Sequence, residues 1–151
     1  MKSWLTTHYP HPDPDTIPWH IYLQDKYKSA VDGISIGDEI FFYEYKYQKP
    51  LKDGTEFPRG RVGIVRIAFV SGAIYSRDAE IEYANGDVTP WLWGVPTDHE
   101  DEEGFVGRGD VLKVLGYNPG GYLRGFNAGK GVMQLNNAQA YKLTKLFKQG
   151  N

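Results

Sequence analysis

The stretch that decides the fold is Gly33–Tyr47, GISIGDEIFFYEYKY. Within it, residues 40–45 (IFFYEY) place apolar or aromatic side chains on both faces of an extended chain, because successive side chains of a strand point to opposite sides. Ile36–Glu39 (IGDE) predicts a tight turn before the strand, since glycine accepts positive φ and aspartate bonds its own backbone. We therefore expect a central strand that is covered on both sides.

The second run, Gly60–Gly72 (GRVGIVRIAFVSG), predicts the partner of this strand. Its two faces are apolar apart from Arg66, a residue that a curled sheet would direct at a mouth or a ligand. A polar, basic loop, residues 46–59, joins the two runs. Two such strands predict the core of a small barrel.

Length and composition favour one soluble domain, residues 1–151. The absence of cysteine excludes disulfides, thiolate zinc sites and a cysteine nucleophile, and it favours a reducing compartment. No apolar run approaches the ~20 residues that span a bilayer, and the first residues lack the apolar segment of a signal peptide. We expect a cytoplasmic protein with no membrane contact.

Charge is unevenly distributed along the chain. The net charge is −2, but five acidic residues lie within Asp98–Glu103 (DHEDEE), so the remainder is mildly basic. We interpret this acidic run as a solvated loop.

The N-terminal part predicts a strand at Trp4–Thr7, a proline-rich loop and then a short helix over Trp19–Val31 that Pro18 opens. Several side chains of the loop are of metal-ligand type, but alternating prolines hold them apart. We therefore predict no metal site there. The side chains in question are His8, His11, Asp13 and Asp15.

The middle of the chain predicts a hairpin. Ala79–Tyr83 and Asp87–Trp93 flank Asn85-Gly86, a pair that tolerates positive φ. With a period of two, Trp91 and Trp93 point the same way, so that at least one can face a cavity.

The C-terminal part predicts a helix over Gly109–Leu115 that Gly116 ends, a strand at Val132–Leu135 and a final helix. Asn136 and Gln139 fit a capping box for that helix, and Ala140, Leu143 and Phe147 form its buried stripe. Between the two helices lies a glycine-rich segment, residues 117–131, whose only charges are Arg124 and Lys130. Loops of this kind commonly hold phosphate.

This order of elements resembles the EVE domain, a member of the PUA-like superfamily that also holds the YTH and ASCH domains. The best-matching parts are Ile36–Tyr43 (IGDEIFFY) and Gly63–Val70 (GIVRIAFV), and the resemblance covers most of the chain. Residues 112–135, with GYNPGGYLRGF and GKGV, look similar to EVE domains that precede HNH nucleases in modification-dependent restriction systems. The resemblance implies an α+β, β-rich fold, a PUA-like curled β-barrel with flanking short helices.

The resemblance also implies a non-catalytic module, without a cofactor, that flips one modified base into an aromatic cage. The favoured target is 5-methylcytosine or a related modified cytosine in DNA, with modified RNA as the alternative and a separate nuclease as a further partner. Flipping costs a few kcal/mol of stacking, and aromatic side chains in a closed pocket return about that much.

By position, the resemblance implies Trp19 as one wall of the cage and Trp93, or else Trp91, as the other. Thr7 and His8 fall where relatives touch the base edge, and Tyr22 belongs to the same base-binding set. Arg124 and Lys130 occupy the segment that contacts the backbone phosphate in YTH domains. Residues 19–24, WHIYLQ, depart from the usual WDGVRN, which leaves the preferred base open.

Two other functions compete with this interpretation. Asp38, Glu44 and Lys46 are spaced in a way that distantly resembles metal-dependent nucleases, and some ASCH relatives are hydrolases. Alternatively, the chain is an interaction module whose acidic run, residues 98–103, docks a basic partner.

Overall fold

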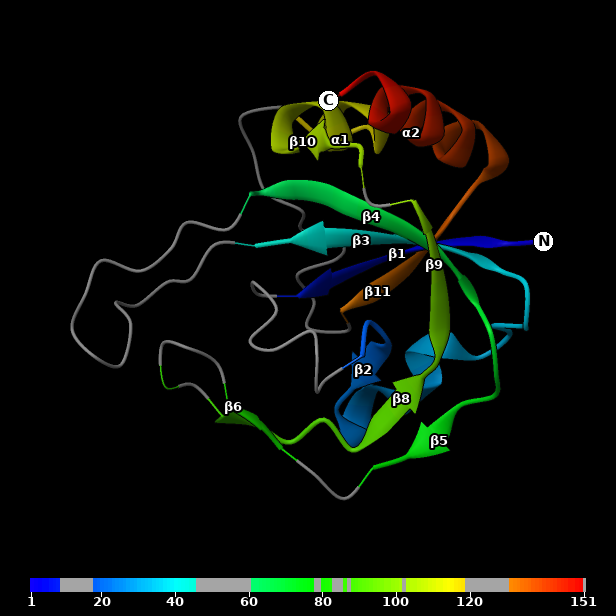
Figure 1. The fold of residues 1–151 in the computed structure, drawn as a ribbon, viewed down its shortest axis with the longest axis vertical. Coiled ribbons are helices and arrows are strands. Elements are labelled where there is room, and N and C mark those ends of the chain that lie inside the picture. Colours follow the sequence, from blue (N-terminus) through cyan, green and yellow to red (C-terminus); the bar gives the residue numbers. More distant parts are fainter. Residues whose placement is uncertain are drawn as a thin grey trace.

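The structure, a computed structural model, describes residues 1–8, 18–45, 61–77, 80–82, 86, 88–101, 103–118 and 131–150, with the backbone alone for residues 99–101. Among these residues the largest sheet has the strand order β10-β4-β3-β1-β11, and β9 also pairs with β4. Strand β3 runs parallel to β1 and antiparallel to β4 (Figure 1). The strands are β1 (Ser3–His8), β3 (Glu39–Glu44), β4 (Gly63–Val70), β9 (Thr97–Asp101), β10 (Val106–Gly107) and β11 (Val132–Leu135).

The predicted central strand is β3, and both of its faces are buried. Phe41 and Tyr43 lie in a core that packs under the helices, whereas Ile40 and Phe42 lie in a second core on the opposite face. All four side chains are at most 1% exposed. The two-sided pattern of the sequence is thus the pattern of a sheet with a layer on each face, and β4 is its partner as expected.

Two helices cover one face of the sheet (Figure 1). They are α1 (Arg108–Val114) and α2 (Asn137–Gln149). Gly116, with φ +85°, ends α1 as predicted, because the Tyr117 and Gly116 amides donate to the carbonyls of Leu112 and Lys113 in a Schellman arrangement. No helix among the described residues is long and apolar enough to cross a membrane.

Shorter elements cover the other face. Among the described residues, β2 (Ile21–Leu23), β8 (Trp93–Val95) and β5 (Tyr75–Ser76) form a three-stranded sheet, and the 3₁₀ helix η1 (Asp25–Val31) follows β2. A separate two-stranded hairpin, β6 (Ile81–Glu82) and β7 (Val88–Thr89), confirms the pairing predicted around Asn85-Gly86. The described sheets do not close into a complete barrel.

The predicted helix over Trp19–Val31 is wrong in its first half. Residues 21–23 form strand β2, which pairs antiparallel with β8, and helical structure begins at Asp25. Trp19 and Leu23 fit a helical stripe, but together with Ile21 they fit the two-residue period of a strand equally well, and β8 offers an edge to pair with. Tertiary pairing therefore decides between two periods that the sequence allows.

The sequence predicted that the acidic run is a loop, but in the structure part of it is a strand. Its backbone from Asp98 to Asp101 belongs to β9, which pairs with residues 67–70 of β4. Charged side chains on a strand at a sheet edge oppose pairing with other chains. The buried strand β4 therefore gains a hydrogen-bonded partner that also protects its edge.

The capping box of α2 gives a first testable effect on stability. Asn136 Oδ1 accepts from the Gln139 amide at 2.8 Å, and Gln139 Oε1 accepts from the Asn136 amide at 2.9 Å. We expect Asn136→Ala to lower the free energy of unfolding by about 1 kcal/mol, measured by urea denaturation. Asn136→Asp keeps the acceptor and is expected to stay within about 0.5 kcal/mol of the parent; equal losses in both variants would contradict a capping role.

Candidate functional site

A cluster of three rings and a guanidinium lies where β1, β3 and β4 approach the start of β2. The Trp19 ring lies 4.8 Å from His8 and 5.5 Å from Phe42, each at 81° to it, and the Arg66 guanidinium carbon lies 4.7 Å from the Trp19 ring centre. We call these four residues the Trp19 cluster. Trp19 and His8 are half-buried, whereas Phe42 is fully buried.

Strand register explains why these residues meet. Phe42 lies between Thr6 of β1 and Arg66 of β4, so that Phe42 and Arg66 are direct cross-strand neighbours. His8 follows Thr6 by two positions and therefore shares its face of β1. The pairing of β3 with β4 shifts register just after Phe42, an irregularity of the kind that redirects side chains at sites.

Arg66 carries the charge of the cluster. Its side chain is only 6% exposed in the middle of an apolar strand, where a cation is costly to hold unless it has specific contacts. Its place over the Trp19 ring is a cation–π contact, which strengthens as water is excluded. The sequence marked Arg66 as the one break in the apolar rows but did not link it to Trp19, and it gave no sign that Phe42 belongs to the site, because Phe42 reads as ordinary core.

The end of β1 also binds the last residue of the glycine-rich segment, Gly131. The Thr7 amide and the Thr6 hydroxyl both donate to the Gly131 carbonyl, at 3.1 and 2.9 Å. Thr7 is half-buried beside His8. Arg124 and Lys130, the predicted phosphate contacts, lie outside the described residues.

The sequence analysis expected Trp19 and Trp93 to form two walls of one cage, but the structure places them apart. In the β2–β8 register Trp93 is opposite Leu23, and Val95 is opposite Ile21. Trp19 lies beyond Ile21, so four strand residues, roughly 13 Å, separate the two positions. The Trp93 ring instead lies under the Lys28 ammonium at 3.9 Å and donates from Nε1 to Asp25 at 2.8 Å.

Tyr22 and Trp91 form part of a different group of contacts. Since side chains alternate along β2, Tyr22 points away from the face that holds Trp19, and its hydroxyl donates to the Pro18 carbonyl at 2.7 Å. The Arg77 guanidinium lies 4.6 Å from the Tyr22 ring centre and donates to the Trp91 carbonyl at 3.0 Å. Tyr22 and Trp19 therefore lie on opposite sides of β2.

His20 also lies on this outer face. Its Nδ1 is 2.6 Å from the Tyr75 hydroxyl. Burial lowers the pKa of His20, and the Arg77 charge lowers it further against the opposing effect of Asp98. Burial raises the pKa of Tyr75. At neutral pH the pair is therefore a neutral hydrogen-bonded contact, which links the residue before β2 to β5 across the intervening strand β8.

The carboxylates proposed for a nuclease do not share a site. Asp38 precedes β3 and Glu44 ends it, so six residues, roughly 20 Å, separate them. Asp38 accepts hydrogen bonds from the Lys2 amide, Trp4 Nε1 and the Ser35 amide, and Glu44 accepts one from the Arg61 amide. No cluster of metal-ligand type occurs among the described residues, and Lys46 lies outside them. Asp38 and Glu44 are therefore structural acceptors.

Comparison with solved structures finds the same fold along nearly the whole chain. Human THYN1, in a crystal structure with DNA that contains 5-methylcytosine, matches with a TM-score of 0.58 and 9% identity, covering 100% of both chains. A hypothetical protein from Leishmania major matches with 0.60 and 12%, covering 99% of this chain and 96% of that one. A protein from Pseudomonas putida matches with 0.58 and 17%, covering 95% and 98%. No family model and no curated protein matches the sequence.

These matches confirm the fold expected from the resemblance to the EVE domain. The chain has a mixed α+β, PUA-like fold, the fold of the EVE-domain protein THYN1. At such low identity the likeness concerns the fold alone and assigns no role to individual residues of this chain.

Proposed function

We propose that this chain is a non-catalytic module that binds DNA containing a modified cytosine, 5-methylcytosine or a close relative, and that it stacks the flipped base on Trp19. The observation that carries the proposal is the Trp19 cluster itself: a half-buried indole just before β2, with the His8 and Phe42 rings at 81° to it and the Arg66 guanidinium over it. In this proposal the whole chain, residues 1–151, acts as one domain.

Stacking supplies the affinity in this mechanism. Taking a base out of a duplex costs a few kcal/mol, and stacking on an aromatic side chain returns about 1–3 kcal/mol per base. Because the Phe42 and His8 rings pack against the indole at 81°, little rotamer freedom is lost when a base arrives. A methylated cytosine has more apolar surface to bury there than cytosine has.

Polar groups around the indole would fix the orientation of the base. Arg66 places a permanent cation over the indole ring. We assign the contact with the base edge to His8, at the end of β1; the side chain of Thr7, the other residue expected there, points to the opposite face of β1 because side chains alternate along a strand. We assign the neighbouring phosphates to Arg124 and Lys130 on the segment whose end, Gly131, is bonded to β1.

The shared fold with THYN1 supports DNA as the polymer, because THYN1 was solved with 5-methylcytosine DNA along a fold that matches this chain over its full length. The separation of Asp38 and Glu44 argues against the nuclease alternative. Any cleavage associated with this module would come from a separate nuclease.

The test is a titration of matched oligonucleotides by fluorescence anisotropy. Duplexes with one cytosine, 5-methylcytosine or 5-hydroxymethylcytosine are compared with single-stranded DNA and RNA of the same sequence, at several salt concentrations. We expect tighter binding of a modified duplex than of the unmodified one. Equal, weak binding of all probes would overturn the proposal, and a preference confined to modified RNA would replace DNA with RNA.

Arg66 gives a separate prediction at this site. Arg66→Lys keeps the charge but loses the planar group over the indole, so we expect about a tenfold loss of affinity for modified DNA, equivalent to about 1.4 kcal/mol. Affinity for unmodified DNA should change by less than about threefold, because non-specific binding depends on charge. An equal loss for both probes would assign Arg66 to the phosphate backbone instead.

A further inference from the structure

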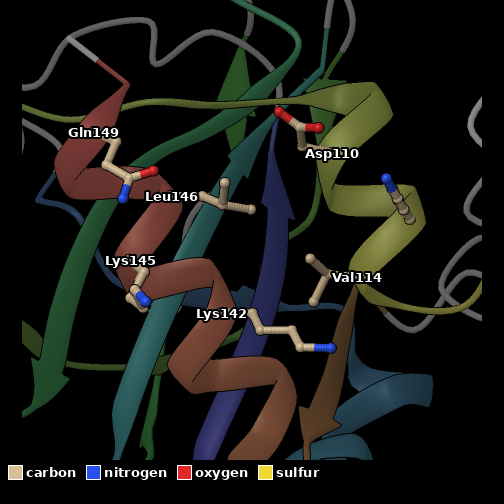
Figure 2. A pocket seen from close by; sticks show the side chains of 7 residues that line it. Asp110, Val114, Lys142, Lys145, Leu146 and Gln149 are labelled. Atoms are coloured by element: carbon tan, nitrogen blue, oxygen red, sulfur yellow. The ribbon is translucent and has the colours of Figure 1, made fainter.

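A groove between the two helices lies on the face of the sheet opposite the Trp19 cluster. It has a volume of about 480 Å³ and is lined by Asp110, Lys113, Val114, Lys142, Lys145, Leu146 and Gln149 (Figure 2). The first three come from α1 and the others from α2. We call it the α1–α2 groove.

The groove has an apolar floor. Leu146 points from α2 into the space between the helices, and Val114 points into it from α1 (Figure 2). Both side chains are half-buried, because they also pack against the core under the helices. A purely solvated helix face would not leave such apolar surface in a hollow.

The rim of the groove is basic. Lys113 lines it from α1 and Lys142 and Lys145 from α2, and Asp110 is the single acid among the described lining residues. All three lysines are exposed, and Lys142 extends across the groove toward α1 (Figure 2). The remaining lysine of α2, Lys148, lies near Glu39 of β3: burial raises the pKa of Glu39, and the Ser3 hydrogen bond and the Lys148 charge only partly offset this. The positive charge of the rim is thus local, in a chain whose net charge is −2.

We propose that the α1–α2 groove docks a short acidic amphipathic helix of a partner protein. Apolar side chains at helical spacing would cover Leu146 and Val114, while carboxylates on the flanks would meet the lysines. A phosphate backbone fits less well, because it offers nothing apolar to the floor. The proposal is independent of the modified-base site and gives the module a second surface, for a protein.

The size of the groove sets the strength of binding. From Lys142 to Gln149 α2 rises roughly 10 Å, so that about two turns of a partner helix fit. An interface this small is weak, with a dissociation constant on the order of 100 µM. Such binding suits a transient contact or one that is strengthened by a second attachment.

The test uses a fluorescein-labelled peptide of about twelve residues, with leucine at i, i+3, i+4 and i+7 and glutamate at most other positions. We expect it to bind the full chain and to shift the amide NMR signals of α1 and α2. The variant Lys142→Glu with Lys145→Glu should weaken binding about tenfold, whereas Lys26→Glu, an equally exposed lysine on η1, should leave it unchanged. Melting temperatures equal to that of the parent would show that the variants fold.

Three further arms decide the occupant. A peptide with serine in place of leucine should not bind; equal binding of that peptide would overturn the proposal by reducing the groove to a general anion surface. If unmodified DNA displaces the leucine peptide, as judged by the amide NMR signals of α1 and α2, the groove belongs to nucleic acid instead. If no peptide binds at all, the proposal is also overturned. Trp19→Ala should leave peptide binding unchanged, so that failure of the base-reading function is distinguishable.

Discussion

Replacing Trp19 with alanine is expected to remove the preference for modified DNA. The indole is the stacking surface of the proposed site and is contacted by His8, Phe42 and Arg66. Loss of one base–aromatic stack is worth about 1–3 kcal/mol, so affinity for the 5-methylcytosine duplex should fall by about tenfold to a hundredfold. Weak, salt-dependent binding of unmodified DNA should persist, because backbone contacts supply it.

A matched variant separates a specific role for Trp19 from loss of any tryptophan. Trp93→Ala also deletes a half-buried indole that packs on the same core, but its ring contacts Lys28 and Asp25 at the other end of the β2–β8 ladder. We expect it to change the affinity for modified DNA by less than about threefold, and we expect Trp19→Phe to retain most of the preference. Equal effects of Trp19→Ala and Trp93→Ala, measured by anisotropy on folded protein, would contradict the Trp19 site and favour a cage with two tryptophan walls.

Replacing Asp38 with alanine is expected to have the largest effect on stability. The side chain is only 3% exposed, and it accepts from the Lys2 amide at 3.0 Å, from Trp4 Nε1 at 3.1 Å and from the Ser35 amide at 2.9 Å. Alanine would leave the buried indole N–H of Trp4 without its acceptor and would untie the start of β1 from the turn before β3. We expect a loss of about 3 kcal/mol in the free energy of unfolding, measured by urea denaturation.

The pH dependence of stability tests the charge of Asp38 separately. Burial raises its pKa, but the hydrogen bonds from Lys2, Ser35 and Trp4 outweigh this, and the net pKa is below the ordinary value of 3.8. Because the unfolded chain then binds the proton more tightly, this contribution is fully present above about pH 4 and is lost as pH falls through the lowered pKa.

Asp38→Asn should therefore remove the loss of stability at low pH that comes from protonation of Asp38. The difference between the free energies of unfolding of the parent and of Asp38→Asn, measured as a function of pH, isolates the contribution of this carboxylate. The control is Asp32→Ala, an exposed acid nearby, which should stay within about 0.5 kcal/mol of the parent. A parallel pH dependence of the parent and Asp38→Asn between pH 2 and about pH 5 would contradict a charged Asp38 in the fold.

Much of the fold follows from local pattern. Residues 40–45 have apolar side chains on both faces, and a strand of that kind is stable only between two layers, which is how β3 lies. Gly116 and the Asn136–Gln139 pair fix helix ends through contacts within a few residues, so the sequence contains all of the required information. The resemblance of IGDEIFFY and GIVRIAFV to the EVE domain then extended this local pattern to the α+β, PUA-like architecture that the structural matches confirm.

The predictions of local structure that were wrong concern segments whose conformation depends on partners far along the chain. The stripe of Trp19 and Leu23 suits a helix or a strand equally, and only the edge of β8 makes it a strand. Part of the acidic run is extended in β9 because its backbone forms hydrogen bonds with β4. In both cases a backbone pairing overrode the local preference, and such pairings cannot be read from a single segment.

The candidate site shows the same division. By itself, the sequence determined which residues were unusual: a tryptophan, Trp19, just after the proline-rich loop, a single cation at Arg66 among apolar neighbours, and His8 at a strand end. Only the tertiary structure decided that these three meet around Phe42 while Trp93 and Tyr22 do not, because the register of β1, β3 and β4 and the alternation along β2 set which side chains share a face. Side-chain chemistry is local information, but proximity depends on strand register, which many distant hydrogen bonds fix together.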